Sequence, residues 1–161
     1  MDKTHNQKAV AAILAEYKNV IIALQRVIDG VSFADLTTIV DTTTANSDCQ
    51  SIQTIVTHIV SSGYAYCGYI RKLRKKTDER PGKILRLSVT EYCNDLDLLV
   101  EYTQETFADI CDEDLEEFEH HRKMLTSWGQ VYDIEQMMEH AIVHVLRHRR
   151  QIEKFKRKLD F

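Results

Sequence analysis

Hydrophobic side chains recur along this chain at the spacing of amphipathic α-helices. Between Asn6 and Ile28 the apolar residues follow each other at three, four and seven positions, which predicts a helix with one buried face. Asp29-Gly30 ends this helix, because glycine readily adopts the left-handed conformation found just beyond a helix. The predicted buried stripe consists of Ile13, Leu14, Tyr17, Ile21, Leu24 and Ile28.

A second helix is predicted from about Cys49 to Lys76. It follows a threonine-rich polar stretch that ends in Ser47 and Asp48, and either of these side chains can cap a helix. Its end is basic, which complements the negative end of the helix dipole. The apolar stripe consists of Ile52, Ile55, Ile59, Tyr66, Ile70 and Leu73.

Two capping boxes mark the start of the remaining helices. The first places Ser88 as N-cap, with Glu91 reaching back, before a helix that runs to about Ile110. The second places Asp133 as N-cap before a helix from Ile134 to about Lys158. The acidic stretch between them, residues 112–119, is expected to form a short helix or an ordered loop. The inward face of the third helix is predicted to carry Tyr92, Leu96, Leu99, Thr103 and Phe107.

Four amphipathic helices joined by polar connections predict an all-α protein, a four-helix bundle. One proline and five glycines among 161 residues also favour long helices over strands and turns. A chain of this length fits one domain, here residues 1–161, and suffices for a real core.

Composition narrows the classes of function. The net charge of −4 gives no general attraction to nucleic acid or to an anionic membrane, so neither is expected as a partner. No apolar run approaches the roughly 20 residues of a membrane span, and the first residues do not resemble a signal peptide. The four cysteines are widely spaced and form no C-x-x-C pair. These features predict a cytoplasmic protein with reduced, mostly buried thiols.

The informative chemistry is a run of histidines in the last helix. His140, His144 and His148 recur every four residues. Neighbours at this spacing lie about 6 Å apart along the axis, so one metal ion can take two of them, whereas the outer pair lies about 12 Å apart. On a helical wheel His148 falls inside the apolar stripe, His144 at its margin and His140 outside it. A buried imidazole needs a partner, which favours His144 and His148 as the metal-binding pair.

A third ligand must come from another helix, and His58 is the candidate. It lies at the edge of the second helix's stripe, about ten residues from the start of that helix. If the second and fourth helices are antiparallel, this ring reaches the height of His148. The adjacent His120 and His121 are expected at the surface, and His5 in a frayed end.

The segment from His144 to Ile152 resembles the C-terminal signature of the DinB/YfiT-like superfamily. In that family a histidine, three residues and a second histidine precede Arg-Gly-Gln and an aliphatic residue. A single histidine in the second helix, here His58, completes the set, and Trp128-Gly129 before the last helix is also similar. The chain departs from the pattern at Arg150, where the family usually has glycine. The resemblance spans nearly the whole chain in length and helix order.

The resemblance implies an up-down-down-up bundle in which His58, His144 and His148 bind one divalent metal, Zn or Ni. Family members include thiol S-transferases that use bacillithiol or mycothiol, a mycothiol-dependent isomerase and metal-dependent hydrolases. Three neutral imidazoles leave open positions on the ion, as in catalytic rather than structural sites. We therefore expect a metal-activated water or thiol that acts on a small molecule. Gln151, one turn beyond His148, is a candidate to orient a ligand or the substrate.

Other readings remain open. A di-iron carboxylate site needs two Glu-x-x-His motifs, and only Glu117–His120 matches. A non-enzymatic stress-response or partner-binding bundle that has lost its metal is a further alternative. The basic segments 71–76 and 147–158 then bind an anionic partner, or simply complement the helix dipoles. A homodimer is also predicted. Three consecutive apolar residues, Val20-Ile21-Ile22, are more than one buried stripe needs, so an exposed apolar helix face is expected that can pair with a second copy.

Overall fold

Helices dominate the computed structural model, which describes residues 6–160. The four long ones are α1 (Lys8–Ile28), α3 (Ile52–Leu73), α4 (Val89–Thr106) and α5 (Ile134–Lys158). A short helix, α2 (Phe33–Thr37), follows α1. The predicted all-α character is thus confirmed. The remaining elements are the 3-10 turns η1 (Ser47–Cys49), η2 (Asp112–Asp114) and η3 (His120–Arg122) and the two-residue strands β1 (Met124–Leu125) and β2 (Val131–Tyr132).

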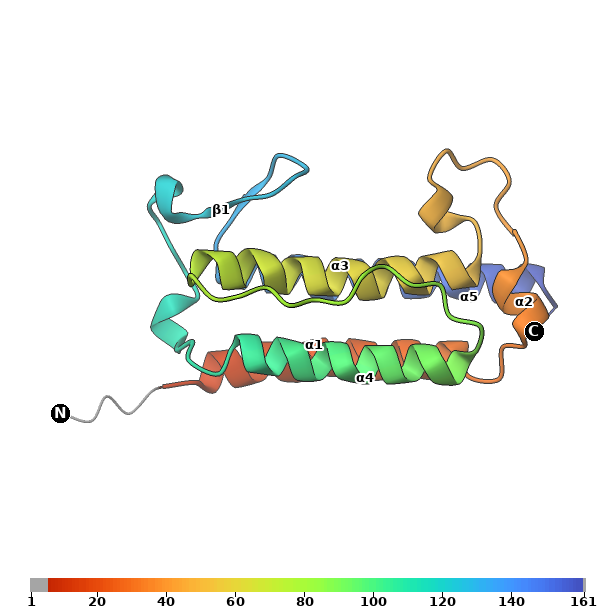
Figure 1. The fold of residues 1–161 in the computed structure, drawn as a ribbon, viewed down its shortest axis with the longest axis horizontal. Coiled ribbons are helices and arrows are strands. Elements are labelled where there is room, and N and C mark those ends of the chain that lie inside the picture. The colour runs from red at the N-terminus through yellow and green to blue at the C-terminus, as the bar shows by residue number, and fades with distance from the viewer. Residues whose placement is uncertain (1–5, 161) are drawn as a thin grey trace.

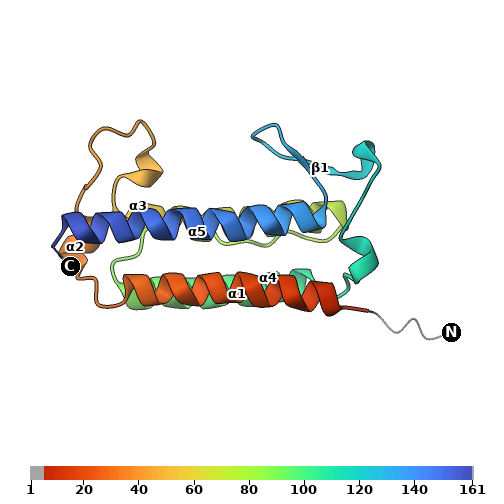
Figure 2. The same cartoon turned by 180° about the vertical axis from the view of Figure 1, so that it is seen from behind.

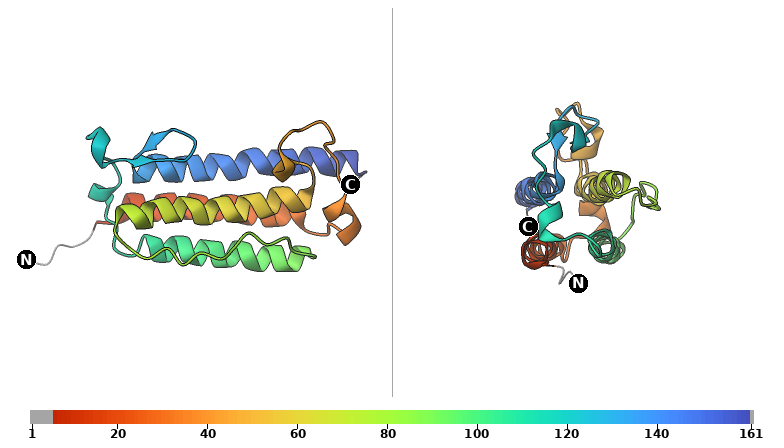
Figure 3. Two further views of the ribbon diagram at one scale, coloured as in Figure 1. Left: turned by 45° about the horizontal axis from the view of Figure 1, so that its top comes forward. Right: turned by 90° about the vertical axis from the view of Figure 1, so that its left-hand side faces the viewer.

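The four long helices lie side by side, with α1 next to α5 and α3 next to α4 (Figure 3). Helices α1 and α5 run in one direction, and α3 and α4 run in the other (Figures 1 and 2). Because α3 and α4 are parallel neighbours, the chain between them must return along the length of both helices. Residues 74–88 do this as an extended segment, which we call the strap (Figure 1).

The buried faces of the long helices form one hydrophobic cluster. The inward face predicted for the third helix is confirmed, because all five of its side chains are at most 1% exposed. In α1, Val20 and Ile21 are also buried in this core, at 8% and 1% exposure. Ile22, the third residue of this apolar run, is half-buried, and the homodimer stays a prediction.

Three helix boundaries differ from those predicted, and one of them is the end of α3, which lies at Leu73 rather than Lys76. Helix α3 begins at Ile52 rather than Cys49, because Ser51 and Thr54 form the capping box while residues 47–49 make a separate 3-10 turn. Helix α4 ends at Thr106, four residues before Ile110, and the chain continues into turns.

The predicted caps of the last two long helices are present. The Ser88 hydroxyl accepts a hydrogen bond from the backbone N–H of Glu91, whose carboxylate accepts one in return from the Ser88 hydroxyl. Asp133 and Gln136 form a complete capping box, and α5 spans the residues predicted for it. Short polar motifs thus set where both helices begin.

Two irregular segments rise on the α3–α5 side of the helices (Figure 1). One is the threonine-rich loop that contains η1. The other is a hairpin in which β1 and β2 pair in antiparallel fashion, with Met124 opposite Tyr132. The acidic stretch before the hairpin contains η2 and leads into η3, in keeping with the expected ordered connection. None of the described helices is both long and apolar enough to cross a membrane.

Candidate metal centre

Three histidines from two neighbouring helices converge at one point. His58 comes from α3, while His144 and His148 lie one turn apart on α5. Ring nitrogens of all three lie within 4.8 Å of one another, and Nε2 of His58 is 3.0 Å from Nε2 of His144. Within residues 6–160 no other group of histidine, cysteine and acidic side chains converges in this way.

The helix packing explains the convergence. Helices α3 and α5 are adjacent and antiparallel, so a residue near the start of one faces a residue well along the other (Figure 1). His148 is 8% exposed, which matches its predicted place inside the apolar stripe. His58 and His144 are half-buried at the margin of the same interface.

The separation of the nitrogens suits a small divalent ion. Zinc binds imidazole nitrogen at about 2.0–2.1 Å, so two tetrahedral ligands lie roughly 3.3 Å apart. The separation of 3.0 Å between His58 and His144 is close to that value, and the largest in the group exceeds it by less than 2 Å. Small side-chain rotations therefore suffice to surround one ion, so the donors present fit the metal that the family resemblance implies.

The Nδ1 atoms of His148 and His58 have oxygen partners that set the tautomers of these two rings. Nδ1 of His148 lies 3.0 Å from the Oε1 atom of Gln151, and Nδ1 of His58 lies 3.4 Å from a carboxylate oxygen of Asp48. Each Nδ1–H can donate to its oxygen, which leaves the lone pair of Nε2 directed into the group. The Gln151 amide N–H₂ faces the carbonyl oxygen of Cys49, which fixes its orientation. Ligating histidines in metalloproteins are characteristically held by such carbonyl or carboxylate oxygens.

Burial keeps the rings neutral. It lowers the pKa of His144 to about 3, with smaller contributions from His148 and His58. Burial also lowers the pKa of both of these neighbours, although the Asp48 carboxylate and Gln151 partly oppose the effect. Metal binding requires neutral imidazole, so the group is in the competent state at neutral pH.

His140 lies outside this group, in an aromatic cluster beside it. Its ring stacks on Trp128 with centroids 5.1 Å apart and an interplanar angle of 21°. Nδ1 of His140 is 3.4 Å from the hydroxyl of Tyr132, and the ring of Tyr66 contacts both His140 and His144. Aromatic side chains thus line the hairpin side of the three histidines.

A cavity opens beside the histidines, toward the threonine-rich loop. Its volume is about 690 Å³, and both His58 and His148 line it. The thiol-bearing Cys49 and the side chains of Arg147 and Arg150 also border this space. A small molecule in this cavity therefore has direct access to two of the three histidines.

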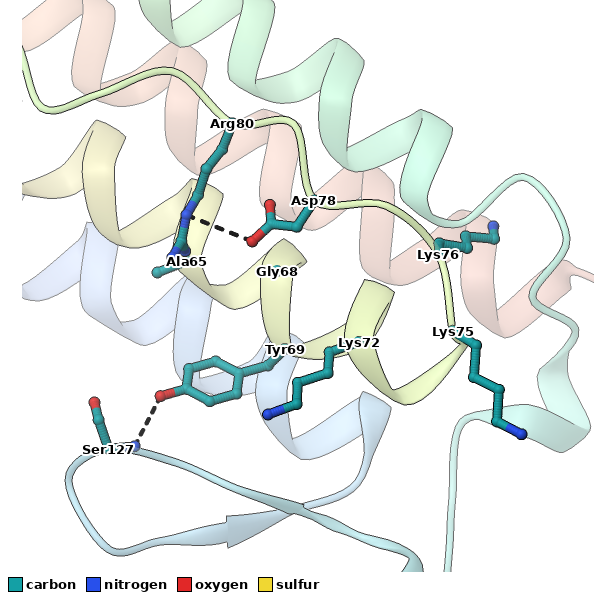
Figure 4. A pocket seen from close by; sticks show the side chains of 9 residues that line it. All are labelled: Ala65, Gly68, Tyr69, Lys72, Lys75, Lys76, Asp78, Arg80 and Ser127. Atoms are coloured by element: carbon teal, nitrogen blue, oxygen red, sulfur yellow. Dashed lines mark hydrogen bonds and ion pairs between the residues drawn. The ribbon is translucent and has the colours of Figure 1, made fainter.

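A second cavity, of about 790 Å³, lies along the C-terminal half of α3 and contains none of the three histidines (Figure 4). Arg80 and Asp78 form an ion pair over it, and the backbone N–H of Ser127 donates to the hydroxyl of Tyr69. Lysine side chains project around its rim (Figure 4). Of these two cavities, only the first is lined by members of the histidine group.

The remaining histidine and cysteine predictions have mixed outcomes. His120 and His121 are exposed, as expected, and His5 lies outside the described residues. A di-iron site needs two Glu-x-x-His motifs, and within residues 6–160 only Glu117–His120 has this pattern. No disulfide joins the four cysteines, which all lie within residues 6–160, but the expectation that they are mostly buried is wrong, because only Cys67 is buried.

Sequence reasoning missed two residues beside the site. The sequence indicates Asp48 only as a helix cap and Cys49 only as a thiol, yet the Asp48 carboxylate lies beside His58 and Cys49 lines the cavity. Asp48 also forms an ion pair with Lys83 of the strap, which holds the carboxylate in place. No sequence spacing relates the loop that contains Asp48, the helix that contains His58 and the strap that contains Lys83. They come together only in the folded structure.

Comparison with known proteins does not identify a family for this chain. No protein-family model matches this sequence, and no curated protein matches it significantly. The resemblance to the DinB/YfiT-like superfamily therefore rests on the histidine spacing and on the helix order.

Proposed function

We propose that this chain is a divalent-metal-dependent enzyme of the DinB/YfiT type, built as an up-down-down-up four-helix bundle. His58, His144 and His148 are the ligands, and Zn or Ni is the expected ion. The substrate is a small molecule, and the reaction is hydrolysis or thiol S-transfer. The observation that carries the proposal is the convergence of one ring nitrogen from each of the three histidines within 4.8 Å, with an oxygen atom beside the other ring nitrogen of two of them.

The donor set favours catalysis over a purely structural role. A divalent ion with three imidazole ligands and an open position acts as a Lewis acid and makes a bound water or thiol a good nucleophile near neutral pH. The chain's own part is to hold the ligands and shape their surroundings. Gln151 and Asp48 hold His148 and His58 in the tautomer that presents Nε2. The buried ring of Tyr66 packs edge-on against His144, while the cavity leaves room for a substrate.

Metal content of the tag-free protein tests the proposal. Protein dialysed against a chelator is titrated with Zn²⁺ or Ni²⁺ by calorimetry, and retained metal is measured by mass spectrometry. We expect one ion per chain and strongly reduced occupancy in His58→Ala, His144→Ala and His148→Ala, because each change removes one of three ligands. His140→Ala and the exposed His121→Ala are matched controls that should retain the ion.

Two outcomes contradict the proposal in different ways. If His140→Ala loses the metal while His148→Ala keeps it, the choice of ligands is wrong. If the tag-free protein takes up neither ion at neutral pH, the metalloenzyme assignment fails. The non-enzymatic, partner-binding bundle then becomes the better account.

A further inference from the structure

The cavity beside His58 and His148 carries a strong local positive charge. Arg147, Arg150 and Lys154 all line it, and no acidic side chain does. Two arginines and one lysine give this wall a formal charge of about +3 at neutral pH, since the buried imidazoles are neutral. The whole chain, in contrast, has a net charge of −4. The positive wall is therefore a property of this place and not of the molecule as a whole.

These cations are exposed and available to a ligand. No ion pair with a carboxylate is formed by Arg147, Arg150 or Lys154 within residues 6–160. Arg149, one position away on the same helix, does pair, with the Glu153 carboxylate 3.3 Å from its Nε atom. The helix thus neutralises an arginine that does not line the cavity, while the three cations that line it form no ion pair within residues 6–160.

The three cationic side chains lie on one face of α5. Positions 147, 150 and 154 are separated by three and four residues, so the charged ends form a row about 10 Å long beside the histidine pair. Arginine presents several N–H donors in a planar fork that matches carboxylate and phosphate oxygens. A row of this kind suits an anionic group at one end of a small molecule whose other end reaches the histidines.

The helix dipole does not account for this row. Its effect is confined to the last turn of a helix, which in α5 already carries Lys156, Arg157 and Lys158. Arg147 lies eleven positions before Lys158, or about 16 Å along the axis, and Arg150 about 12 Å. At that distance a positive charge gains little from the helix terminus.

We propose that this cavity binds a small anionic molecule, with a phosphate or carboxylate group held by Arg147, Arg150 and Lys154. The inference deepens the proposed function, because it names the substrate class of the three-histidine site. Anion binding itself needs only the cationic wall, so it can be measured on the metal-free protein. The two proposals can therefore fail separately.

Calorimetric titration of metal-free protein with inorganic phosphate, and separately with succinate, tests the inference at fixed ionic strength. We expect saturable binding of at least one of these probes, weakened by added NaCl because the attraction is electrostatic. Arg147→Gln and Arg150→Gln should each weaken it about threefold or more, and the double variant about tenfold or more. Arg157→Gln, an exposed arginine on the same helix outside the cavity, should leave the affinity unchanged. Circular dichroism confirms that each variant is folded.

The two probes distinguish the chemistry of the ligand. Preference for phosphate indicates a phosphate ester, and preference for succinate indicates a carboxylate. A perturbed NMR signal of the His148 ring on binding, without one for His121, places the anion in this cavity. Absence of saturable binding of either probe, or equal weakening in Arg157→Gln, overturns the inference. Phosphate binding without metal uptake overturns the proposed function and leaves the anion site standing.

Discussion

In the metal-free protein the three-histidine group should make folding stability depend on pH through His144. Burial lowers the pKa of this imidazole from 6.5 to about 3 in the folded state. The unfolded chain retains the ordinary pKa, so below pH 6.5 it binds a proton that the folded protein does not. Unfolding therefore becomes more favourable as pH falls from 6.5 toward 3. Above pH 6.5 both states are neutral and this penalty disappears.

The magnitude follows from the width of that interval. One pKa unit corresponds to about 1.4 kcal/mol, so at pH 5 the difference of about 1.5 units costs about 2 kcal/mol of stability. His144→Gln removes the titrating group and keeps a polar side chain of similar size. Urea unfolding at pH 7.5 and pH 5, followed by circular dichroism with a chelator present, gives the free energy of unfolding. The wild type should lose about 2 kcal/mol more than the variant over this interval.

A matched variant separates this effect from general acid destabilisation. His121→Gln removes a histidine whose side chain is 75% exposed, and it should keep the pH dependence of the wild type. If His144→Gln loses as much stability between the two pH values as the wild type does, burial of this ring does not set the pH dependence. The argument for a neutral, metal-competent group is then refuted.

Three further substitutions test the packing, each measured by urea unfolding at pH 7.5. Gly63→Ala should destabilise by about 1 kcal/mol or more despite its better helix propensity, because the new Cβ would lie 2.6 Å from a methyl group of buried Leu99. Tyr92→Phe should cost about 1–3 kcal/mol, since its buried hydroxyl donates to the carbonyl of Gln53 and contacts Thr57. Lys75→Gly should stabilise by about 1 kcal/mol, because Lys75 has a φ of 56°, which glycine adopts without strain.

The helices could be predicted from the sequence because their signals are local. The stripe of α4 and the capping box at Asp133 depend on residues within a few positions of each other. The start of α3, in contrast, could not be predicted, because the local signals there are ambiguous. Ser47, Asp48 and Ser51 are all good caps within five positions, and only the turn at residues 47–49 decides among them.

The histidine group was partly predictable. The spacing of His144 and His148 and the central place of His148 on the wheel gave the α5 half of the site. The position of His58 required an antiparallel neighbour, an assumption about tertiary structure that the helix pattern alone does not supply. The position of Asp48 beside His58 could not be predicted from the sequence, because it depends on the path of a loop and on an ion pair with Lys83 of the strap.

The strap connects the fold to the site. Because α3 and α4 are parallel, residues 74–88 must run the length of both helices, and this path carries Lys83 to the loop that contains Asp48. The Asp48 carboxylate in turn lies 3.4 Å from Nδ1 of His58, so the return connection helps to set the tautomer of this proposed ligand on α3. The site also has a cost for the metal-free fold, since three imidazoles are crowded together and held neutral. The divalent ion that we propose would offset that cost, because it would stabilise only the folded state, in which the three histidines already converge. The same geometry that weakens the metal-free protein in acid therefore favours metal binding near neutral pH.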